Sequence, residues 1–155
     1  MRRILDMKDV PNGTEAEAYC TLDGRRYNLF YVMELSADLK KKKDSKSRLG
    51  TQIKGHKSTS VEGTGKMKMY GVSSLFKKKM IEYAKTGVDF FFDIQVTKED
   101  PGTSIGRETI FLYECNIDNA TIVNINIDDE TLTYDVDFTF ESSDMPETYT
   151  ELEGM

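Results

Sequence analysis

Apolar and polar residues alternate most regularly over residues 131–140, towards the C-terminal end of the chain. A period of two places neighbouring side chains on opposite faces of an extended chain, which predicts a half-buried β-strand. The apolar face consists of Leu132, Tyr134, Val136, Phe138 and Phe140. Similar but weaker runs predict strands at residues 16–22, 25–35, 66–70, 90–97, 107–116 and 120–127. Asp23-Gly24, between the first two runs, is typical of a hairpin turn.

One segment has a helical period instead. Ser73 or Ser74 can cap the start of a helix, and Gly87 can end it. Apolar residues recur between them at helical spacing and predict a buried face made of Val72, Phe76, Met80, Tyr83 and Ala84. The sequence therefore predicts a mainly β domain with one α-helix.

Three segments show no regular period: an N-terminal arm at residues 1–15, a connection at 36–66, and an acidic C-terminal tail at 142–155 that is expected to be mobile. The connection contains Lys40–Lys43 and four glycines, but few large apolar residues. A connection of this length is unusual in a compact domain. It is interpreted either as a flexible surface loop or as an arm that becomes ordered against a neighbouring molecule.

The 155 residues suit a single domain spanning 1–155, and charge divides this chain sharply. Residues 1–87 carry 19 Lys and Arg against 10 Asp and Glu, a balance of +9. Residues 88–155 carry 2 against 17, a balance of −15, which gives the net charge of −6. This division is either chance clustering on a hydrated surface or a self-complementary pattern, in which the basic part of one copy meets the acidic part of another.

Nothing in the sequence predicts insertion into a membrane or export. The chain has no apolar run of about 18 residues, and no apolar stretch follows the basic start Met1-Arg2-Arg3. Cys20 and Cys115 both lie in predicted strands. Two cysteines are too few for a disulfide framework, so we expect reduced thiols in the core.

The sequence offers no complete set of residues for catalysis, for a cofactor or for a metal. His56 is the only histidine and is far in sequence from both cysteines. Gly63-Thr64-Gly65-Lys66 resembles part of a phosphate-binding loop, but Ser60 and Met67 stand where that motif needs glycine and Ser or Thr. No enzyme, cofactor or metal site is therefore expected. Nucleic-acid binding by the lysine runs 40–43 and 77–79 is an alternative, although no aromatic residues are interleaved with these lysines.

From about Leu49 to Glu151 the chain resembles the tail tube proteins of contractile-tailed phages, phage-like particles and R-type bacteriocins. The order and spacing of six short stretches carry the resemblance: 55–59, 63–65, 70–74, 83–87, 109–113 and 136–141. The resemblance implies an antiparallel β-sandwich or β-barrel of the phage tail tube type, with one flanking helix and a long assembly loop. Residues 36–66 would then be an extended loop between subunits.

The resemblance also implies a function. Six copies would form a ring, and the rings would stack into the hollow inner tube of a contractile particle, a conduit for DNA in a phage or for ions in a bacteriocin. The implied partners are other copies, the sheath protein, the baseplate or tube initiator, the tail terminator and the tape measure protein; DNA would only pass through. The particle would assemble in the cytoplasm of the host bacterium.

Two groups of residues are candidates for this role. Residues expected in the inter-subunit assembly loop are Lys54, Gly55, His56, Lys57, Ser58 and Thr59. The acids expected to face the lumen of the tube are Asp135, Asp137 and Glu141. Two other functions remain open: a ring-forming tube protein of the type VI secretion kind, and a monomeric β-domain that binds a ligand or nucleic acid.

Overall fold

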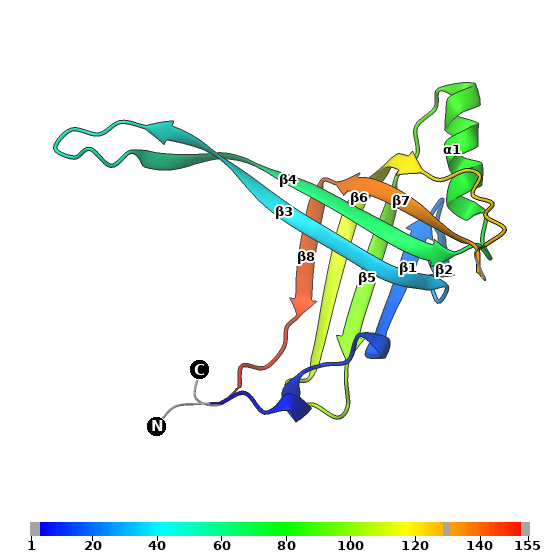
Figure 1. Ribbon diagram of the computed structural model, residues 1–155, viewed down its shortest axis with the longest axis horizontal. Coiled ribbons are helices and arrows are strands. Elements are labelled where there is room, and N and C mark those ends of the chain that lie inside the picture. Colours follow the sequence, from blue (N-terminus) through cyan, green and yellow to red (C-terminus); the bar gives the residue numbers. More distant parts are fainter. Residues whose placement is uncertain (1–3, 129–130, 153–155) are drawn as a thin grey trace.

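The computed structural model describes residues 4–128 and 131–152, which form eight strands, one α-helix and two short 3-10 helices (Figure 1). The strands are β1 Ala16–Leu22, β2 Arg25–Asn28, β3 Val32–Lys46, β4 Gly55–Tyr70, β5 Phe92–Glu99, β6 Arg107–Ala120, β7 Thr133–Phe140 and β8 Ser142–Glu147. The helices are η1 Met7–Asp9, η2 Gly13–Glu15 and α1 Leu75–Thr86. The mainly β architecture with one helix agrees with the sequence prediction.

The strands form two antiparallel layers that share β6. Its first half pairs with β5 and β8, and its second half pairs with β7. One layer is therefore β2-β1-β5-β6 with β8, and the other is β6-β7-β4-β3. In Figure 1 the β3-β4-β7 layer crosses over the other strands at a steep angle. Such crossing is typical of orthogonal β-sandwiches, where one bent strand turns the corner between layers.

The bend in β6 occurs at Glu114, whose φ of 52° lies in the left-handed region. Its backbone N–H donates to the Asp93 carboxylate at 3.1 Å, which satisfies a donor that the ladder loses at the bend. Because a β-bulge adds twist and redirects a strand, this position allows β6 to belong to both layers.

The core lies between the two layers and follows the predicted alternation of β7. Tyr134, Val136, Phe138 and Phe140 are buried, which confirms the predicted apolar face; Leu132 lies before the strand and is half exposed. The remaining buried side chains of the core come from β1, β4, β5, β6, α1 and the β2–β3 connection, and include Cys20, Leu22, Leu29, Tyr31, Met67, Met69, Phe76, Phe92, Ile94, Leu112 and Cys115. Burying each large apolar side chain stabilises the fold by roughly 1.5–3 kcal/mol.

The layers do not close into a barrel. β2 and β3 are the two ends of the strand order, and within residues 4–128 and 131–152 they do not pair with one another. Of the two arrangements expected, a sandwich or a barrel, the single chain adopts the open sandwich. Because β2 has only four residues, it is too short to continue along the edge of the 15-residue strand β3.

The connection expected at residues 36–66 is mostly strand. β3 runs on to Lys46 and β4 begins at Gly55, so the two form a long hairpin with a turn at residues 47–54. The strand predicted at 25–35 is divided by a turn at Leu29–Tyr31, where the chain leaves one layer for the other. The hairpin could not be predicted from the sequence, because its strands contain few apolar residues and so show no alternating pattern. Backbone hydrogen bonds between β3 and β4 stabilise it instead.

Two predictions for the C-terminal third were wrong. β6 continues to Ala120, and residues 121–127, predicted as a strand, are not in a β-ladder. The tail expected to be mobile from residue 142 instead begins with β8, which pairs with β6. Arg107 fastens β8 through Nε and Nη2 hydrogen bonds of 2.6 and 2.8 Å to the Glu147 carboxylate. A bidentate pair of this kind fixes the two side chains in one planar geometry. Because it joins residues far apart in the sequence, hydrophobic periodicity cannot predict it.

Helix α1 begins after Ser74 and ends at Gly87, which has a φ of 72°, as the capping pattern predicted. Of its predicted apolar face, Phe76 is buried and Met80 is partly buried, but Val72, Tyr83 and Ala84 are exposed. The helix packs on the sandwich mainly through its first turns, and Lys79 ties it to the β1–β2 turn by a 2.6 Å contact with Asp23. In the described part of the chain, no helix has the length and apolar character needed to cross a membrane.

Cys20 and Cys115 are both free and fully buried, which confirms their predicted place in the core. Burial raises the pKa of each thiol to about 12. A thiol with so high a pKa stays protonated near neutral pH and is a poor nucleophile.

Candidate assembly surfaces

The β3–β4 hairpin extends beyond the sandwich, and none of the residues 36–66 belongs to the buried core (Figure 1). The six predicted assembly residues lie together at its far end. Lys54 is in the turn, and Gly55, His56, Lys57 and Ser58 are paired across the hairpin with residues 43–46. Thr59 donates its hydroxyl to the carbonyl of Lys42 at 3.2 Å. The structure therefore brings all six residues into one projecting element.

The turn of the hairpin presents two apolar side chains to solvent. Leu49 is fully exposed and Ile53 is 74% exposed. Arg48 stabilises this turn, because its guanidinium donates a hydrogen bond to the carbonyl of Ile53 at 3.4 Å. The Arg48 side chain also packs closely over Gly55, where an added Cβ would lie 3.2 Å from it. An ordered turn with exposed apolar residues is suited to contact with another surface.

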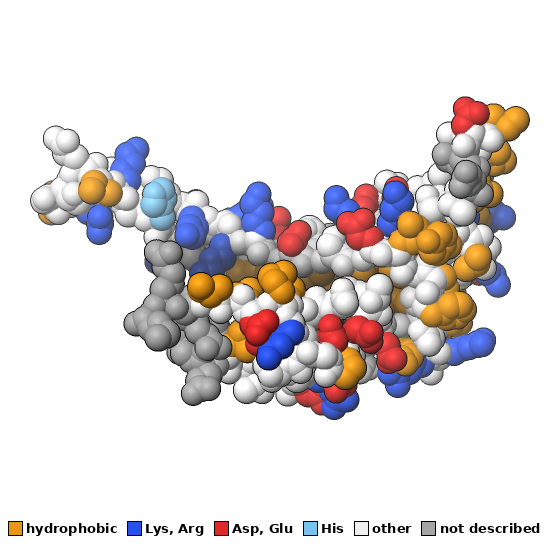
Figure 2. Space-filling model, turned by 60° about the horizontal axis from the view of Figure 1, so that its bottom comes forward, with side chains coloured by type: hydrophobic (Ala, Val, Ile, Leu, Met, Phe, Trp, Pro, Cys, Tyr) orange, Lys and Arg blue, Asp and Glu red, His pale blue; other side chains and the backbone are white. Residues whose placement is uncertain are grey.

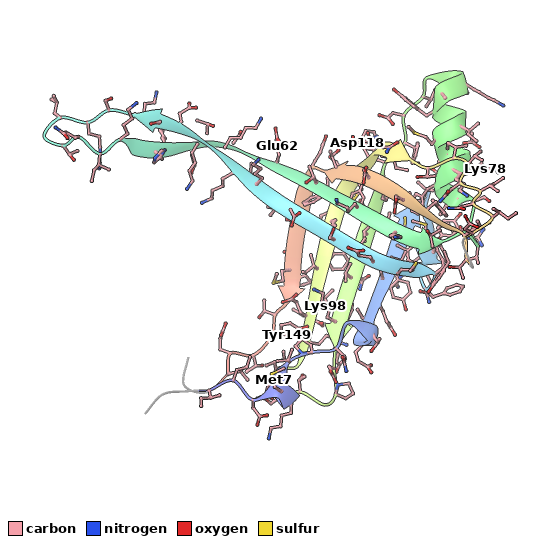
Figure 3. All side chains as sticks on the ribbon, viewed as in Figure 1. Met7, Glu62, Lys78, Lys98, Asp118 and Tyr149 are labelled. Carbon is pink, nitrogen blue, oxygen red and sulfur yellow. The ribbon has the colours of Figure 1, made fainter. Side chains whose placement is uncertain are left out.

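The hairpin is also strongly basic. Residues 40–59 carry eight Lys or Arg and one Asp, a net charge of +7. Figure 2 shows basic side chains spread along this narrow projection. At its base Glu62 (Figure 3) forms a 2.7 Å ion pair with Lys42, and hydrogen bonding from Lys42 lowers the pKa of Glu62. The remaining lysines favour an acidic partner surface.

The three predicted lumen acids lie on or beside the outward face of β7, opposite the buried face. Asp135 pairs in register with Lys68 of β4, and Asp137 pairs with Lys66. Opposite charges on directly facing strand positions attract one another, so this face is an alternation of acids and lysines and not a purely acidic wall. Lys66 and Lys68 were missed from the sequence, although their alternation with Met67 and Met69 was a signal that they share this outward face.

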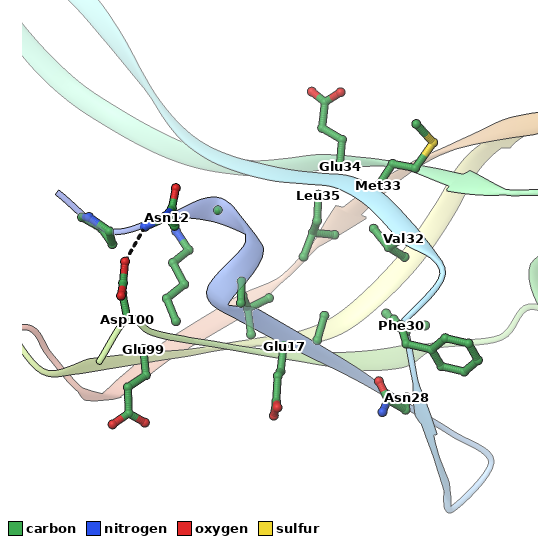
Figure 4. A pocket seen from close by; sticks show the side chains of 17 residues that line it. Asn12, Glu17, Asn28, Phe30, Val32, Met33, Glu34, Leu35, Glu99 and Asp100 are labelled. Carbon is green, nitrogen blue, oxygen red and sulfur yellow. Dashed lines mark hydrogen bonds between the residues drawn. The ribbon is translucent and has the colours of Figure 1, made fainter. Parts of the chain in front are cut away.

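A groove of about 640 Å³ marks the side on which the sandwich is open. It lies between the start of β3 and strands β1 and β5. Val32 and Leu35 point into it, whereas Met33 and Glu34 point away (Figure 4). Lys98 of β5 also lines it (Figure 3). Polar and apolar groups contribute about equally to the walls of the groove, and its lining does not assemble a metal site within residues 4–128 and 131–152.

A model of the phage tail tube protein family matches residues 3–147. This chain belongs to that family. The tube protein is 34% identical to the phage-like element PBSX protein XkdM of Bacillus subtilis (strain 168) over 138 residues, which cover 84% of this chain and 94% of the relative.

Solved structures show the same fold at low sequence identity. A chain in the anti-feeding prophage baseplate has a TM-score of 0.63 and 7% identity, with 84% of the tube protein and 91% of that chain covered. A chain in the sheath-tube complex of PVC, an extracellular contractile injection system, has a TM-score of 0.60 and 9% identity, with 83% and 86% covered. The tube protein is thus a non-enzymatic structural protein, a tube subunit with a fold that also occurs in contractile injection systems.

Glu141, the third predicted lumen acid, does not share the pairing of the other two. It lies just after β7 beside Glu114 at the bend of β6, and the interaction between the two carboxyl groups raises the pKa of Glu114. A hydrogen bond between two carboxyl groups needs a proton on one of them. The tube protein therefore has a protonation-sensitive contact at the point where its two layers join.

Replacing Glu141 by Gln is expected to raise the melting temperature of the tube protein at neutral pH by at most a few degrees. Because the pKa of Glu114 is raised in the folded state, the favourable contact is fully present below the ordinary glutamate pKa and is lost as pH rises through the raised value. The Gln amide removes the like charge. The difference between the variant and the wild type should shrink towards zero near pH 4, and a difference independent of pH would contradict this explanation.

Proposed function

We propose that six copies of the tube protein form a ring and that rings stack into a hollow tube. The observation that carries this proposal is the β3–β4 hairpin. It is long, ordered and basic, yet none of its residues 36–66 is part of the buried core cluster. An exposed, ordered element of this kind is suited to pack against another molecule. Lys54 and residues 55–59 at its far end are therefore the proposed contacts between copies.

The polar face of β3, β4 and β7 is the proposed wall of the channel. It presents Asp135 and Asp137 beside Lys66 and Lys68, so it is hydrated and its local charges nearly balance. A wall that offers phosphates no continuous basic surface lets DNA pass without binding tightly. In a phage-like particle the conduit would serve DNA, and in a bacteriocin it would serve ions. During assembly the lumen would hold a tape measure protein.

The outside and the ends of the tube are proposed to meet other proteins of the particle. The similar solved chains come from a baseplate and from a sheath-tube complex. By analogy, a contractile sheath would surround this tube, an initiator in the baseplate would start it, and a terminator would end it. The tube would assemble in the bacterial cytoplasm and function as part of the particle.

Native mass spectrometry of the purified protein tests the ring. Six copies of 17.7 kDa give a species of about 106 kDa, and stacked rings give multiples of that mass. Species with another closed subunit number would refute the hexamer. A solution that holds only the 17.7 kDa monomer at every concentration would refute self-assembly altogether.

Changing both Asp135 and Asp137 to Lys in an infectious particle is expected to slow DNA release several-fold. Together with Lys66 and Lys68, the new side chains would place four lysines in one patch of the proposed wall, and phosphates would bind there. Release can be timed by dye binding to ejected DNA. The matched control makes the same two charge reversals elsewhere, with Glu15→Lys in η2 and Glu82→Lys on helix α1, and should release DNA at the normal rate. Equal rates for all three particles would exclude this face from the channel.

A further inference from the structure

The layer formed by β1, β5, β6 and β8 has an outer face that points away from β3 and β4. In the part of the chain that the structure describes, strands pack over only the inner face of this layer, which carries Cys20, Ile94 and Leu112. Figure 4 shows that Glu17 of β1 and Glu99 of β5 extend away from the side on which Val32 and Leu35 lie. A broad sheet face without a second layer is a surface available to another molecule.

The centre of this face is aromatic. The rings of Phe111 and Tyr113 on β6 stack with centroids 5.8 Å apart and an interplanar angle of 3°. Tyr19 on β1 lies under the guanidinium of Arg26, at 4.0 Å from its ring centroid. These side chains are half-buried, and flat aromatic faces accept both aliphatic stems and cationic groups of Lys and Arg.

Acidic side chains surround these rings. Alternation along the strands places five carboxylates on this face, against the two guanidinium groups of Arg26 and Arg107; the carboxylates are those of Glu17, Asp93, Glu99, Asp144 and Glu147. Arg107 is already engaged with Glu147 at 2.6 Å and lies 3.9 Å from Glu99. The face therefore keeps a net negative charge after its own ion pairs are formed.

We infer that this acidic, aromatic face receives the basic β3–β4 hairpin of a second copy of the chain. The charges are complementary, since the hairpin carries +7 over residues 40–59 and the face carries excess carboxylates. Leu49 and Ile53 at the turn supply the apolar contact, and the long lysine stems can lie along Tyr19, Phe111 and Tyr113. This inference rests on the proposed self-assembly and names the surface that the hairpin meets.

The two surfaces belong to different parts of the molecule. Each copy can therefore donate its hairpin to one neighbour and receive a hairpin from another. A contact of this heterologous kind repeats from copy to copy and either closes into a ring or continues as a stack. Because the contact is electrostatic, higher ionic strength should weaken it.

A charge-swap experiment tests the pairing, with pelleting to measure the lowest concentration at which the protein polymerises. One variant carries Lys46→Glu and Lys57→Glu on the hairpin, and the other carries Glu17→Lys and Glu99→Lys on the sheet face. Each alone should raise the polymerisation concentration at least about tenfold, because like charges then face one another. The variant with all four changes should polymerise within about threefold of the wild type. Circular dichroism checks that each variant is folded.

A matched control reverses two acids outside this face, with Asp118→Lys and Asp128→Lys, and should polymerise as the wild type does. Normal polymerisation by both two-residue variants, or no recovery in the folded four-residue variant, would overturn the inference while leaving the tube function intact. A wild-type protein that never polymerises would instead refute the proposed function itself.

Discussion

Shortening the β3–β4 hairpin is expected to abolish polymerisation while leaving a folded monomer. The sharpest version removes residues 43–59 and joins Lys42 to Ser60 through Asn-Gly. Lys42 and Ser60 face one another in register, so a two-residue turn can connect them without changing the rest of the ladder. No buried core residue is lost, because none lies between 36 and 66. Analytical ultracentrifugation should therefore show only monomer at concentrations at which the wild type forms large polymers.

The thermal stability of the shortened protein is the control for this result. Its melting temperature should lie close to that of the wild type, since the removed segment contacts solvent and not the core. A second variant keeps the hairpin at full length and changes only Leu49 and Ile53 to Ser; it should polymerise weakly. Normal tubes from the shortened protein would show that the hairpin has no part in assembly.

Replacing Gly65 by Ala is expected to destabilise the tube protein by about 2 kcal/mol, a fall in melting temperature of about 4–8 °C. Gly65 of β4 faces Phe138 of β7, and a Cβ there would lie 2.4 Å from the ring and 2.9 Å from the carbonyl oxygen of Ser36. The backbone oxygen cannot move without disturbing the β3–β4 ladder. The absence of a side chain at Gly65 therefore leaves room for the Phe138 ring, which packs over β4 at this position.

Gly13→Ala is the matched control for this clash. A Cβ on Gly13 meets nothing within 4 Å, so the change should alter the free energy of unfolding by no more than about 0.5 kcal/mol. Gly63 has the same relation to Phe140, with a Cβ at 2.6 Å from the ring. Thermal unfolding of the three variants should thus separate Gly65 and Gly63 from Gly13. Equal stability of all three would show that the rings move aside at little cost.

The sequence predicted the elements whose burial follows a simple period. The alternation in residues 133–140 reported the buried face of β7, and Asp23 and Gly24 form the hairpin turn with φ of 53° and 76°. Helix α1 was predicted with its cap at Gly87. In each case a local property of the chain, either period or turn chemistry, decides the structure.

The errors arose where pairing and not burial decides the structure. The strands of the hairpin expose both faces over residues 40–46, so they carry no apolar period to reveal them. β8 depends on Arg107 and Thr109, some 40 residues away, which hold Glu147 at 2.6–2.8 Å. Residues 121–127 have the composition of a strand, but in the single chain they are not part of a β-ladder.

The candidate assembly residues were found by the opposite signal, the absence of a core pattern in a long basic segment. Lys54 and residues 55–59 do lie together at the end of the hairpin. The sequence could not reveal the balance of charge around Asp135 and Asp137, because Lys66 and Lys68 are about 70 residues away and reach them only through strand register.

Negative-stain electron microscopy of the concentrated protein, alongside particles purified from the producing bacterium, tests self-assembly most directly. We expect hollow rings or tubes in the purified sample, and the same subunit in the inner tube of the particles. Isolated monomers at every concentration, together with particles that lack this chain, would contradict this expectation.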